Sequence, residues 1–280
     1  MKKLLVAVDF SKSSSYAVEY ASWLGLRLQA DLTALHVSGI IRMEETVSEK
    51  VRREFQEKRE QSLLQQLLRF TSPYPNKAEE ALSAVGRIDC RVRRGEVVEE
   101  LIAGAQQINA DLIIVGTRAK HQLWDHLFGS VTTALIARSP IPVLVIPEGA
   151  AYCEVQRIAF ASEITLDERR VFEWLHGFAE RLSAEVERFY VNILPEEQDK
   201  WKEEIIRQTW PEDAPPRAER LTMIRERSVL KGIDYYLEKY PSEMLALYVP
   251  QRAFPERLLH KSLSKQLAYR TNIPMLVFKA

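Results

Sequence analysis

Short, unbroken apolar runs recur along the first half of the chain, at Leu4–Val8, Leu32–Val37, Leu112–Val115 and Val143–Ile146. Continuous rather than alternating apolar residues are typical of strands that are covered on both faces, as in parallel sheets. A weaker strand candidate lies at Asp89–Val92. The pattern therefore predicts a buried, mainly parallel sheet.

Between these runs the apolar period becomes helical, with spacings of three and four residues. The predicted helices are Ser13–Leu28, Glu44–Arg69, Gly95–Ile108 and Val131–Arg138. Ser11 and Ser13 are candidate N-caps of the first helix, and the prolines at 73 and 75 end the second. Strands that alternate with helices predict an α/β, doubly wound domain with helices on both faces of the sheet.

The second half of the chain repeats this plan. Lys3–Asp9 matches Arg157–Glu163, and Ser139–Ile146 matches Thr271–Phe278, with the matches in the same order along the chain. We therefore expect two tandem domains, 1–147 and 152–280, each with a mainly parallel five-stranded sheet. The expected elements of the second domain are a strand near Ile158, helix Thr165–Leu182, strand Val186–Val191, helix Val229–Tyr240, strand Met244–Val249, helix Pro255–Tyr269 and strand Met275–Phe278. The segment Glu196–Arg220 gives no clear pattern.

Composition narrows the function classes. Lysine plus arginine and aspartate plus glutamate number 39 each, so the chain lacks the basic excess of most proteins that bind nucleic acid. Cys90 and Cys153 lie far apart, without a CxxC motif or neighbouring histidines, which indicates a reducing compartment. No apolar run approaches the length of a membrane span. We expect a cytoplasmic protein that binds neither nucleic acid nor membranes.

Two strand ends carry residues suited to a ligand, because ligands of open parallel sheets bind beyond the carboxyl ends of the strands. Asp9 follows the first strand, where its carboxylate either accepts hydrogen bonds from a base or ribose or caps the next helix. Gly116 directly follows the strand Leu112–Val115, and Gly129 with Ser130 precedes the last helix of the domain. Free N–H groups and a hydroxyl at a helix start favour a phosphate, although a plain Gly-Ser cap has the same sequence.

In order along the chain, Val6–Ser11, Ala30–Val37, Asp111–Gly116 and Ser139–Pro147 resemble the universal stress protein family. Its nucleotide-binding members carry glycine, two residues, glycine, nine residues, then glycine and serine or threonine. Here Gly116, Ala119, Gly129 and Ser130 stand at these positions. The resemblance implies ATP or AMP as ligand, with Mg²⁺ in the case of ATP. It places Asp9 and Val37 at the adenine and ribose and Val115 and Gly116 against the nucleotide. Gly129, Ser130 and Val131 would then offer N–H groups and a hydroxyl to the phosphates.

Two departures from the family pattern weaken this expectation. Ala119 replaces the middle glycine, and a left-handed backbone there costs alanine about 1 kcal/mol or more. In the second domain Tyr248, Gln251 and Lys261 replace all three glycines, Ser262 is kept, and Glu163 stands in place of Asp9. We expect the second domain to be a structural partner or to bind something else.

The sequence offers no catalytic constellation and no metal site, since His121 and His126 have neither helical ligand spacing nor a third ligand. The leading hypothesis is a regulatory module that binds an adenine nucleotide and acts through protein contacts. The alternatives are a slow ATPase, with Asp125 as the added carboxylate, and an interaction protein without nucleotide. The resemblance also implies that the strands Val143–Ile146 and Met275–Phe278 pair the two domains as an intramolecular pseudo-dimer, and it leaves a homodimer open.

Overall fold

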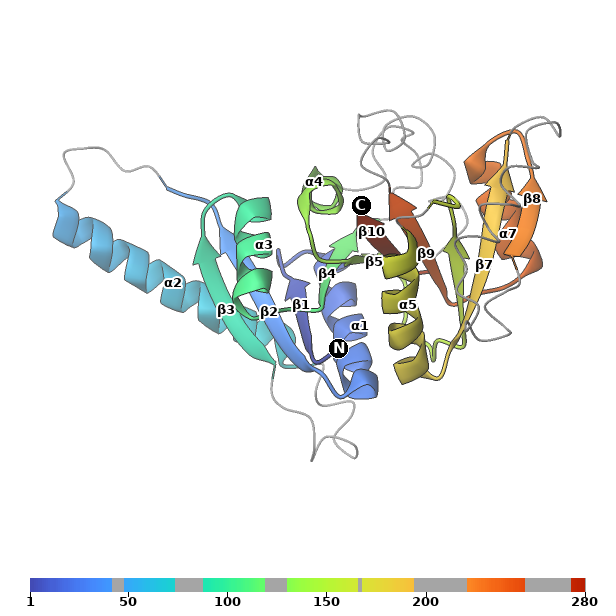
Figure 1. Ribbon diagram of the computed structural model, residues 1–280. Coiled ribbons are helices and arrows are strands. Elements are labelled where there is room, and N and C mark those ends of the chain that lie inside the picture. The colour runs from blue at the N-terminus through green and yellow to red at the C-terminus, as the bar shows by residue number, and fades with distance from the viewer. Residues whose placement is uncertain are drawn as a thin grey trace. The chain divides into compact units, whose positions relative to one another are not determined.

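The computed structural model of the chain describes residues 1–41, 48–73, 88–118, 130–165, 168–193, 221–249 and 273–279. Two compact units are found (Figure 1). Unit 1 consists of Met1–Thr117 and Ser130–Tyr152, and unit 2 is built mainly from Cys153–Ala280.

Unit 1 contains one parallel sheet. Its strands are β1 (Lys3–Ala7), β2 (Asp31–Ser38), β3 (Asp89–Arg94), β4 (Leu112–Thr117) and β5 (Val143–Pro147). They lie in the order β3-β2-β1-β4-β5, and all four neighbouring pairs are parallel. The predicted α/β class is confirmed, including the weak third strand. Because the strands are parallel, their carboxyl ends share one edge of the sheet, which we call the carboxyl edge.

The helices of unit 1 cover both faces of this sheet, as the apolar runs predicted. They are α1 (Lys12–Leu28), α2 (Glu49–Thr71), α3 (Val97–Gln107) and α4 (Ser130–Arg138). A β-carbon on Gly25 of α1 would contact Leu4, whereas one on Gly104 of α3 would contact Leu5. Successive side chains of a strand point to opposite faces, so α1 and α3 lie on opposite sides. Helix α2 shares the face of α1, and α4 packs beside α3.

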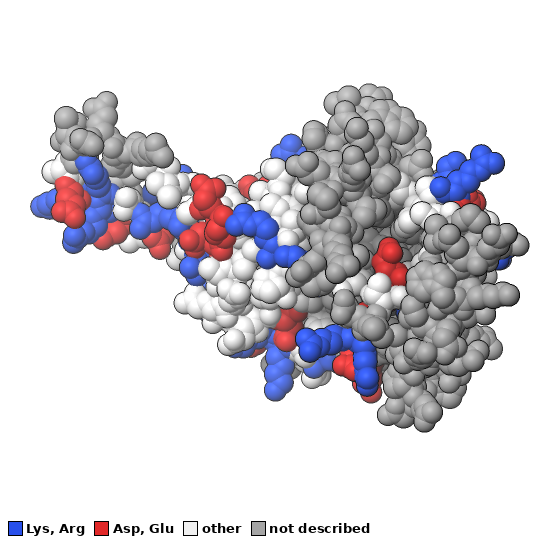
Figure 2. Space-filling model, turned by 45° about the horizontal axis from the view of Figure 1, so that its top comes forward, with Lys and Arg blue, Asp and Glu red and all other residues white. Residues whose placement is uncertain are grey.

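Helix α2 is only partly supported by the sheet. It begins at the N-cap Ser48, while the predicted start at Glu44 lies outside the described residues. Leu67 and Thr71 near its end are buried, but its first half projects away from β2 and β3 with its side chains largely exposed (Figure 1). Acidic and basic side chains are interspersed along it (Figure 2), as expected for a solvated helix face.

Unit 2 has the same strand order with its own set of strands. They are β6 (Arg157–Ala161), β7 (Glu185–Asn192), β8 (Leu221–Arg225), β9 (Met244–Val249) and β10 (Met275–Lys279). The order is β8-β7-β6-β9-β10, again all parallel. The described helices are α5 (Glu168–Leu182) and α7 (Val229–Lys239). The sequence did not predict β8, and the predicted helix Pro255–Tyr269 lies outside the described residues.

The same hydrogen bonds between backbone N–H groups and a carboxylate occur in both units. In unit 1 the backbone N–H groups of Lys2 and Lys3 donate to the Asp111 carboxylate, at 2.6 and 3.0 Å. In unit 2 the N–H groups of Gln156 and Arg157 donate to Glu243, at 3.0 and 2.7 Å. An acidic residue before the fourth strand thus holds the start of the first strand in each unit. None of the described helices has the length and apolarity needed to cross a membrane.

Candidate ligand site at the carboxyl edge of unit 1

Asp9 lies at the carboxyl edge, between β1 and α1. Its side chain is exposed, and its Oδ1 accepts a hydrogen bond from the backbone N–H of Ser11 at 2.9 Å. The N-cap of α1 is Ser11 itself, whose Oγ accepts from the N–H of Ser14 at 3.2 Å. The interpretation of Asp9 as the helix cap is therefore wrong. Because Asp9 is exposed and a carboxylate has about four acceptor positions, it can accept further hydrogen bonds.

The hydroxyl and N–H donors around Asp9 favour its charged form. Partial shielding from water alone would raise the pKa of this carboxyl group. Hydrogen bonds from Ser11 and Ser14 outweigh that effect and hold the pKa below its ordinary value of 3.8. Asp9 is therefore ionised at neutral pH and acts as an acceptor of hydrogen bonds. The run of serines after Asp9 is the sequence signal that could have revealed this arrangement.

Phe10 turns the chain sharply between Asp9 and α1. Its φ of 62° lies in the left-handed region, which is uncommon for any residue other than glycine. The ring packs on His36 of β2, with centroids 4.5 Å apart, and edge-on against Phe70 of α2 at 5.6 Å. His36 in turn bonds through Nδ1 to the carbonyl oxygen of Val8 at 2.8 Å. These contacts fix the strained turn that presents Asp9 at the edge.

Gly116 near the end of β4 lies directly against the first turn of α1. A β-carbon there would stand 2.2 Å from the carbonyl oxygen of Ser13 and 2.9 Å from the nitrogen of Ser14. The structure thus gives this glycine a packing role, namely close approach of helix and strand. On the α1 side of Gly116, the backbone of α1 therefore occupies the space that the sequence analysis predicted for a ligand.

Val37 and Val115 lie on the opposite face of the sheet. Val115 precedes Gly116 in β4 and so points away from α1, and Val37 follows the alternation of β2 to the side of Leu35 and α3. Val37 is half-buried and Val115 is buried. Because β1 lies between β2 and β4, these two valines flank the strand that ends beside Asp9.

The remaining predicted site residues belong to the start of α4. Ser130 is the first residue of this helix and is exposed, and Val131 is half-buried. Helix α4 packs on β4 and β5, on the face that Val115 points to. Ala119 and Gly129 lie outside the described residues. The described part thus brings Asp9, Val37 and Val115 to one edge, with the α4 start on the same face as the two valines.

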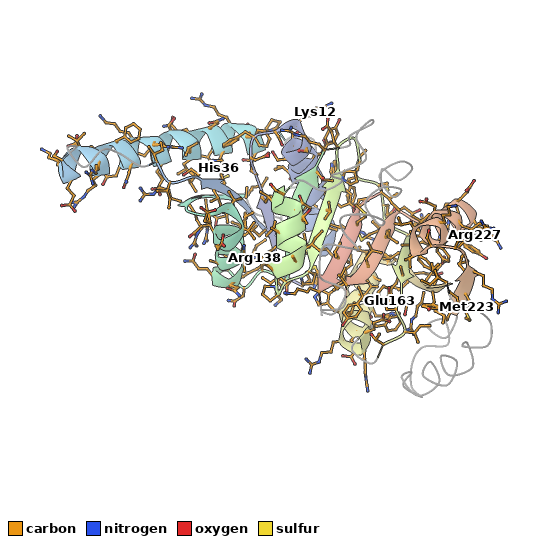
Figure 3. All side chains as sticks on the ribbon, turned by 90° about the horizontal axis from the view of Figure 1, so that it is seen from above. Lys12, His36, Arg138, Glu163, Met223 and Arg227 are labelled. Carbon is orange, nitrogen blue, oxygen red and sulfur yellow. The ribbon has the colours of Figure 1, made fainter. Side chains whose placement is uncertain are left out.

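Lys12, which the sequence analysis did not single out, also lies at this edge. Lys12 in the first turn of α1 (Figure 3) pairs through Nζ with Oε1 of Glu148, which follows β5, at 3.0 Å. Glu148 raises the pKa of this lysine by hydrogen bonding and charge attraction. Lys12 is exposed and Glu148 is half-buried, so the pair contributes little to stability.

The corresponding edge of unit 2 is occupied by a buried polar network. Arg188 of β7 donates through Nη2 to Ser162 Oγ at 2.8 Å and to Glu168 Oε2 at 3.2 Å. Ser162 also donates to Glu168, at 2.6 Å. The turn contains Ile164 with a φ of 55°, the counterpart of Phe10, and the exposed Glu163 (Figure 3) replaces Asp9.

Burial dominates the acid–base behaviour of this network. It raises the pKa of the Glu168 carboxyl group, although hydrogen bonds from Ser162 and the charge of Arg188 oppose the shift. It also lowers the pKa of the Arg188 guanidinium, against the attraction of Glu168. An ion pair with buried hydrogen-bond partners therefore fills the core behind the unit 2 edge.

The other predicted features of unit 2 are only partly described. Tyr248, which replaces the first loop glycine, is buried in β9. Gln251, Lys261 and Ser262 lie outside the described residues, as do His121, His126 and Asp125 in the unit 1 loop. Among the described residues, no group of three or more histidine, cysteine or acidic side chains is arranged to hold a metal ion.

Comparison with known proteins agrees with this architecture. The chain is 36% identical over 90 residues to a stress response protein of Bacillus subtilis, NhaX, a match that covers 27% of this chain and 53% of that protein. It is 27% identical over 155 residues to the universal stress protein YxiE of the same organism, covering 51% and 97%. The chain thus spans about half the length of the first relative and nearly all of the second.

A solved structure extends the likeness to the whole chain. A universal stress protein from Archaeoglobus fulgidus superposes with a TM-score of 0.67 over 99% of this chain and 98% of that one. The two are 17% identical in sequence, so this likeness concerns the fold alone. The sequence model of the universal stress protein family matches residues 1–147. The chain belongs to the universal stress protein family.

Proposed function

We propose that unit 1 binds an adenine nucleotide, ATP or AMP, and that the protein acts as a regulatory stress-response module through protein contacts. The observation that carries this proposal is the exposed, ionised Asp9 at the edge where β1, β2 and β4 end. A carboxylate in this position accepts hydrogen bonds from ribose hydroxyls or an adenine amino group.

The other proposed site residues contact different parts of the nucleotide. Val37 and Val115 give the nucleoside an apolar floor on the α3 and α4 face. Ser130 and Val131 start α4, whose free N–H groups and positive dipole end favour phosphate. Ala119 and Gly129 complete the loop in this proposal, and Mg²⁺ accompanies ATP. Lys12, which is paired with Glu148, lies at the same edge.

A second candidate function is an interaction protein without nucleotide. Gly116 favours it, because the contact with Ser13 explains this glycine by packing and leaves it no required role in ligand binding. At the corresponding edge of unit 2, the buried Glu168–Arg188 ion pair occupies the interior and also favours a structural role. Under this reading both units serve only as scaffolds for protein partners.

We further propose that residues 1–147 and 152–280 are two copies of one domain, paired within the chain as a pseudo-dimer through their last strands. The acidic residue that holds the first strand in each unit and the left-handed residues Phe10 and Ile164 support a common origin. The two cysteines, both free, support a reducing, cytoplasmic location.

Thermal unfolding with added nucleotide tests the first function against the second. A ligand at one hundred times its Kd stabilises the folded state by about 2.7 kcal/mol. We expect Mg-ATP or AMP at millimolar concentration to raise the Tm of the wild-type protein and to have a smaller effect on Asp9→Asn. Equal Tm values with and without nucleotide in the wild type would reject nucleotide binding and favour the interaction protein.

A further inference from the structure

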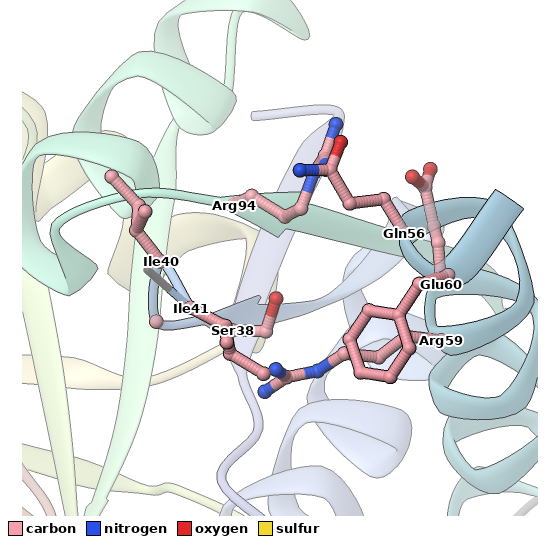
Figure 4. A pocket seen from close by; sticks show the side chains of 9 residues that line it. Ser38, Ile40, Ile41, Gln56, Arg59, Glu60 and Arg94 are labelled. Carbon is pink, nitrogen blue, oxygen red and sulfur yellow. The ribbon is translucent and has the colours of Figure 1, made fainter. Parts of the chain in front are cut away.

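Unit 1 has a hollow at its carboxyl edge whose described lining does not include Asp9. It lies beyond the ends of β2 and β3, where the first half of α2 projects past the sheet (Figure 4). Its volume is about 350 Å³, at the lower end of the range for small-molecule sites. The described residues that line it are Ser38, Gly39, Ile40, Ile41, Phe55, Gln56, Arg59, Glu60 and Arg94.

One part of the lining is apolar and exposed. Ile40 is 72% exposed, Ile41 47% and Phe55 45%, and Val51 one helical turn before Phe55 is exposed as well. Scattered exposed apolar residues are ordinary, but a contiguous group marks a surface that gains by being covered. Burial of such side chains is favourable by about 25 cal/mol per Å² of apolar area. The hollow is therefore suited to the apolar body of a ligand.

The other part of the lining carries two arginines from different elements. Arg59 belongs to α2 and Arg94 ends β3, and within the described chain neither forms an ion pair or hydrogen bond through its side chain. Their neighbours on β3 behave differently. Arg91 donates to Asp89 at 2.7 Å, and Arg93 donates to Glu100 at 2.6 Å. Arg59 and Arg94 thus both border the hollow without a side-chain partner in the described part of the chain.

Their placement suits an anion held beside an apolar wall. In Figure 4 the Arg94 side chain lies beside Gln56, and Arg59 extends towards Ser38 and Ile41. Guanidinium and amide groups supply hydrogen-bond donors of the kind that carboxylates and sulfonates accept. Among the described residues of the lining, Glu60 is the one acidic side chain, so within this set the two arginines leave a single surplus positive charge. This balance favours a ligand with one negative charge.

We propose that this hollow binds a small amphipathic monoanion, a carboxylate or sulfonate with an apolar body. The apolar body lies against Ile40, Ile41 and Phe55, and Arg59 and Arg94 donate to the anionic group. The described residues of this lining are different from those proposed to bind the nucleotide. Packing on the sheet does not account for the projecting first half of α2, and this site would give it a role.

Titration of the full chain with 8-anilinonaphthalene-1-sulfonate, an aromatic sulfonate whose fluorescence rises in apolar surroundings, tests this proposal. We expect saturable binding of one probe molecule at this hollow, displaced by decanoate and weakened by salt. Arg59→Gln and Arg94→Gln should each raise the Kd about tenfold, the effect of one lost charge-assisted hydrogen bond. Phe55→Ala should weaken binding to a similar extent.

Controls separate this site from other surfaces and from the nucleotide. Arg91→Gln alters an arginine of the same strand that is already paired, and Asp9→Asn alters the proposed nucleotide site; both should bind the probe like the wild type. All substituted side chains are exposed or half-buried, and circular dichroism checks that each variant is folded. Absence of saturable binding, or equal Kd values in wild type, Arg59→Gln and Arg94→Gln, would overturn the proposal. Neither result depends on whether ATP or AMP binds.

Discussion

Gly116 of β4 and Ser13 of α1 touch backbone to backbone, so that a β-carbon on the glycine would stand 2.2 Å from the serine carbonyl oxygen. Both groups belong to regular elements, and neither can move without shifting a strand or a helix. The contact sets the distance between α1 and the sheet. It also holds the helix start, and with it Ser11 and Asp9, at the carboxyl edge.

Replacement of Gly116 by alanine should therefore destabilise unit 1. A methyl group forced against backbone costs about 3 kcal/mol, and we expect a matching fall in the free energy of unfolding. Hydrogen exchange followed by mass spectrometry should show the largest loss of protection in α1. The control is Gly177→Ala in α5, where no atom lies within 4 Å of the added carbon and alanine favours the helix by up to about 1 kcal/mol. Unchanged stability of Gly116→Ala would contradict the packing role.

Ser11→Ala should weaken the start of α1. It removes the side chain that accepts from the N–H of Ser14, and loss of an N-cap costs about 1 kcal/mol. The backbone N–H of Ser11 still donates to Asp9 in this variant, so the edge should keep its shape. Denaturant unfolding measures the loss. The matched variant Ser15→Ala removes a hydroxyl that only donates to the carbonyl oxygen of Lys12, and it should cost less.

The stability contributed by Asp9 should depend on pH below its ordinary pKa. Because the folded-state pKa lies below 3.8, ionised Asp9 stabilises the protein above that value, and this contribution is lost as the pH falls through the folded-state pKa. The difference in unfolding free energy between wild type and Asp9→Asn should stay constant from pH 7 to 5 and shrink towards pH 3. If the difference in unfolding free energy between wild type and Asp9→Asn grew on acidification, the pKa of Asp9 would be raised rather than lowered by folding.

The buried pair of unit 2 should be sensitive to removal of one partner. Glu168→Gln leaves Arg188 buried without its counter-charge and should cost about 3 to 5 kcal/mol. A double replacement, Glu168→Gln with Arg188→Met, should recover most of that loss, since two neutral groups of similar size pack without a charge. Thermal or denaturant unfolding of the three proteins measures this coupling. A double variant no more stable than Glu168→Gln would contradict it.

The fold followed from the sequence because parallel strands covered on both faces leave continuous apolar runs. Leu4–Val8 and Val143–Ile146 are such runs, and each gave a strand in nearly the predicted place. Strand β8 was missed because Leu221–Arg225 lies at the end of the strand order in its unit and carries polar residues between its apolar ones. An edge strand with one pairing partner needs less apolar sequence than a central one.

The candidate site could be predicted from the sequence only in part. The position of Asp9 could be predicted from its place after a buried run, because the end of a parallel strand defines the edge. The role of Gly116 could not, since its partner Ser13 lies about a hundred residues away in sequence and the contact involves backbone atoms alone. The hollow beside Arg59 and Arg94 was equally hidden, because it depends on how far α2 projects beyond the sheet.

Isothermal titration calorimetry with Mg-ATP and with AMP tests nucleotide binding by unit 1 most directly. We predict one site per chain for the wild type, a Kd about tenfold higher for Asp9→Asn, and an unchanged Kd for Glu163→Gln, the corresponding position of unit 2. Two sites per chain, no heat of binding, or equal affinity of the wild type and Asp9→Asn would contradict the account.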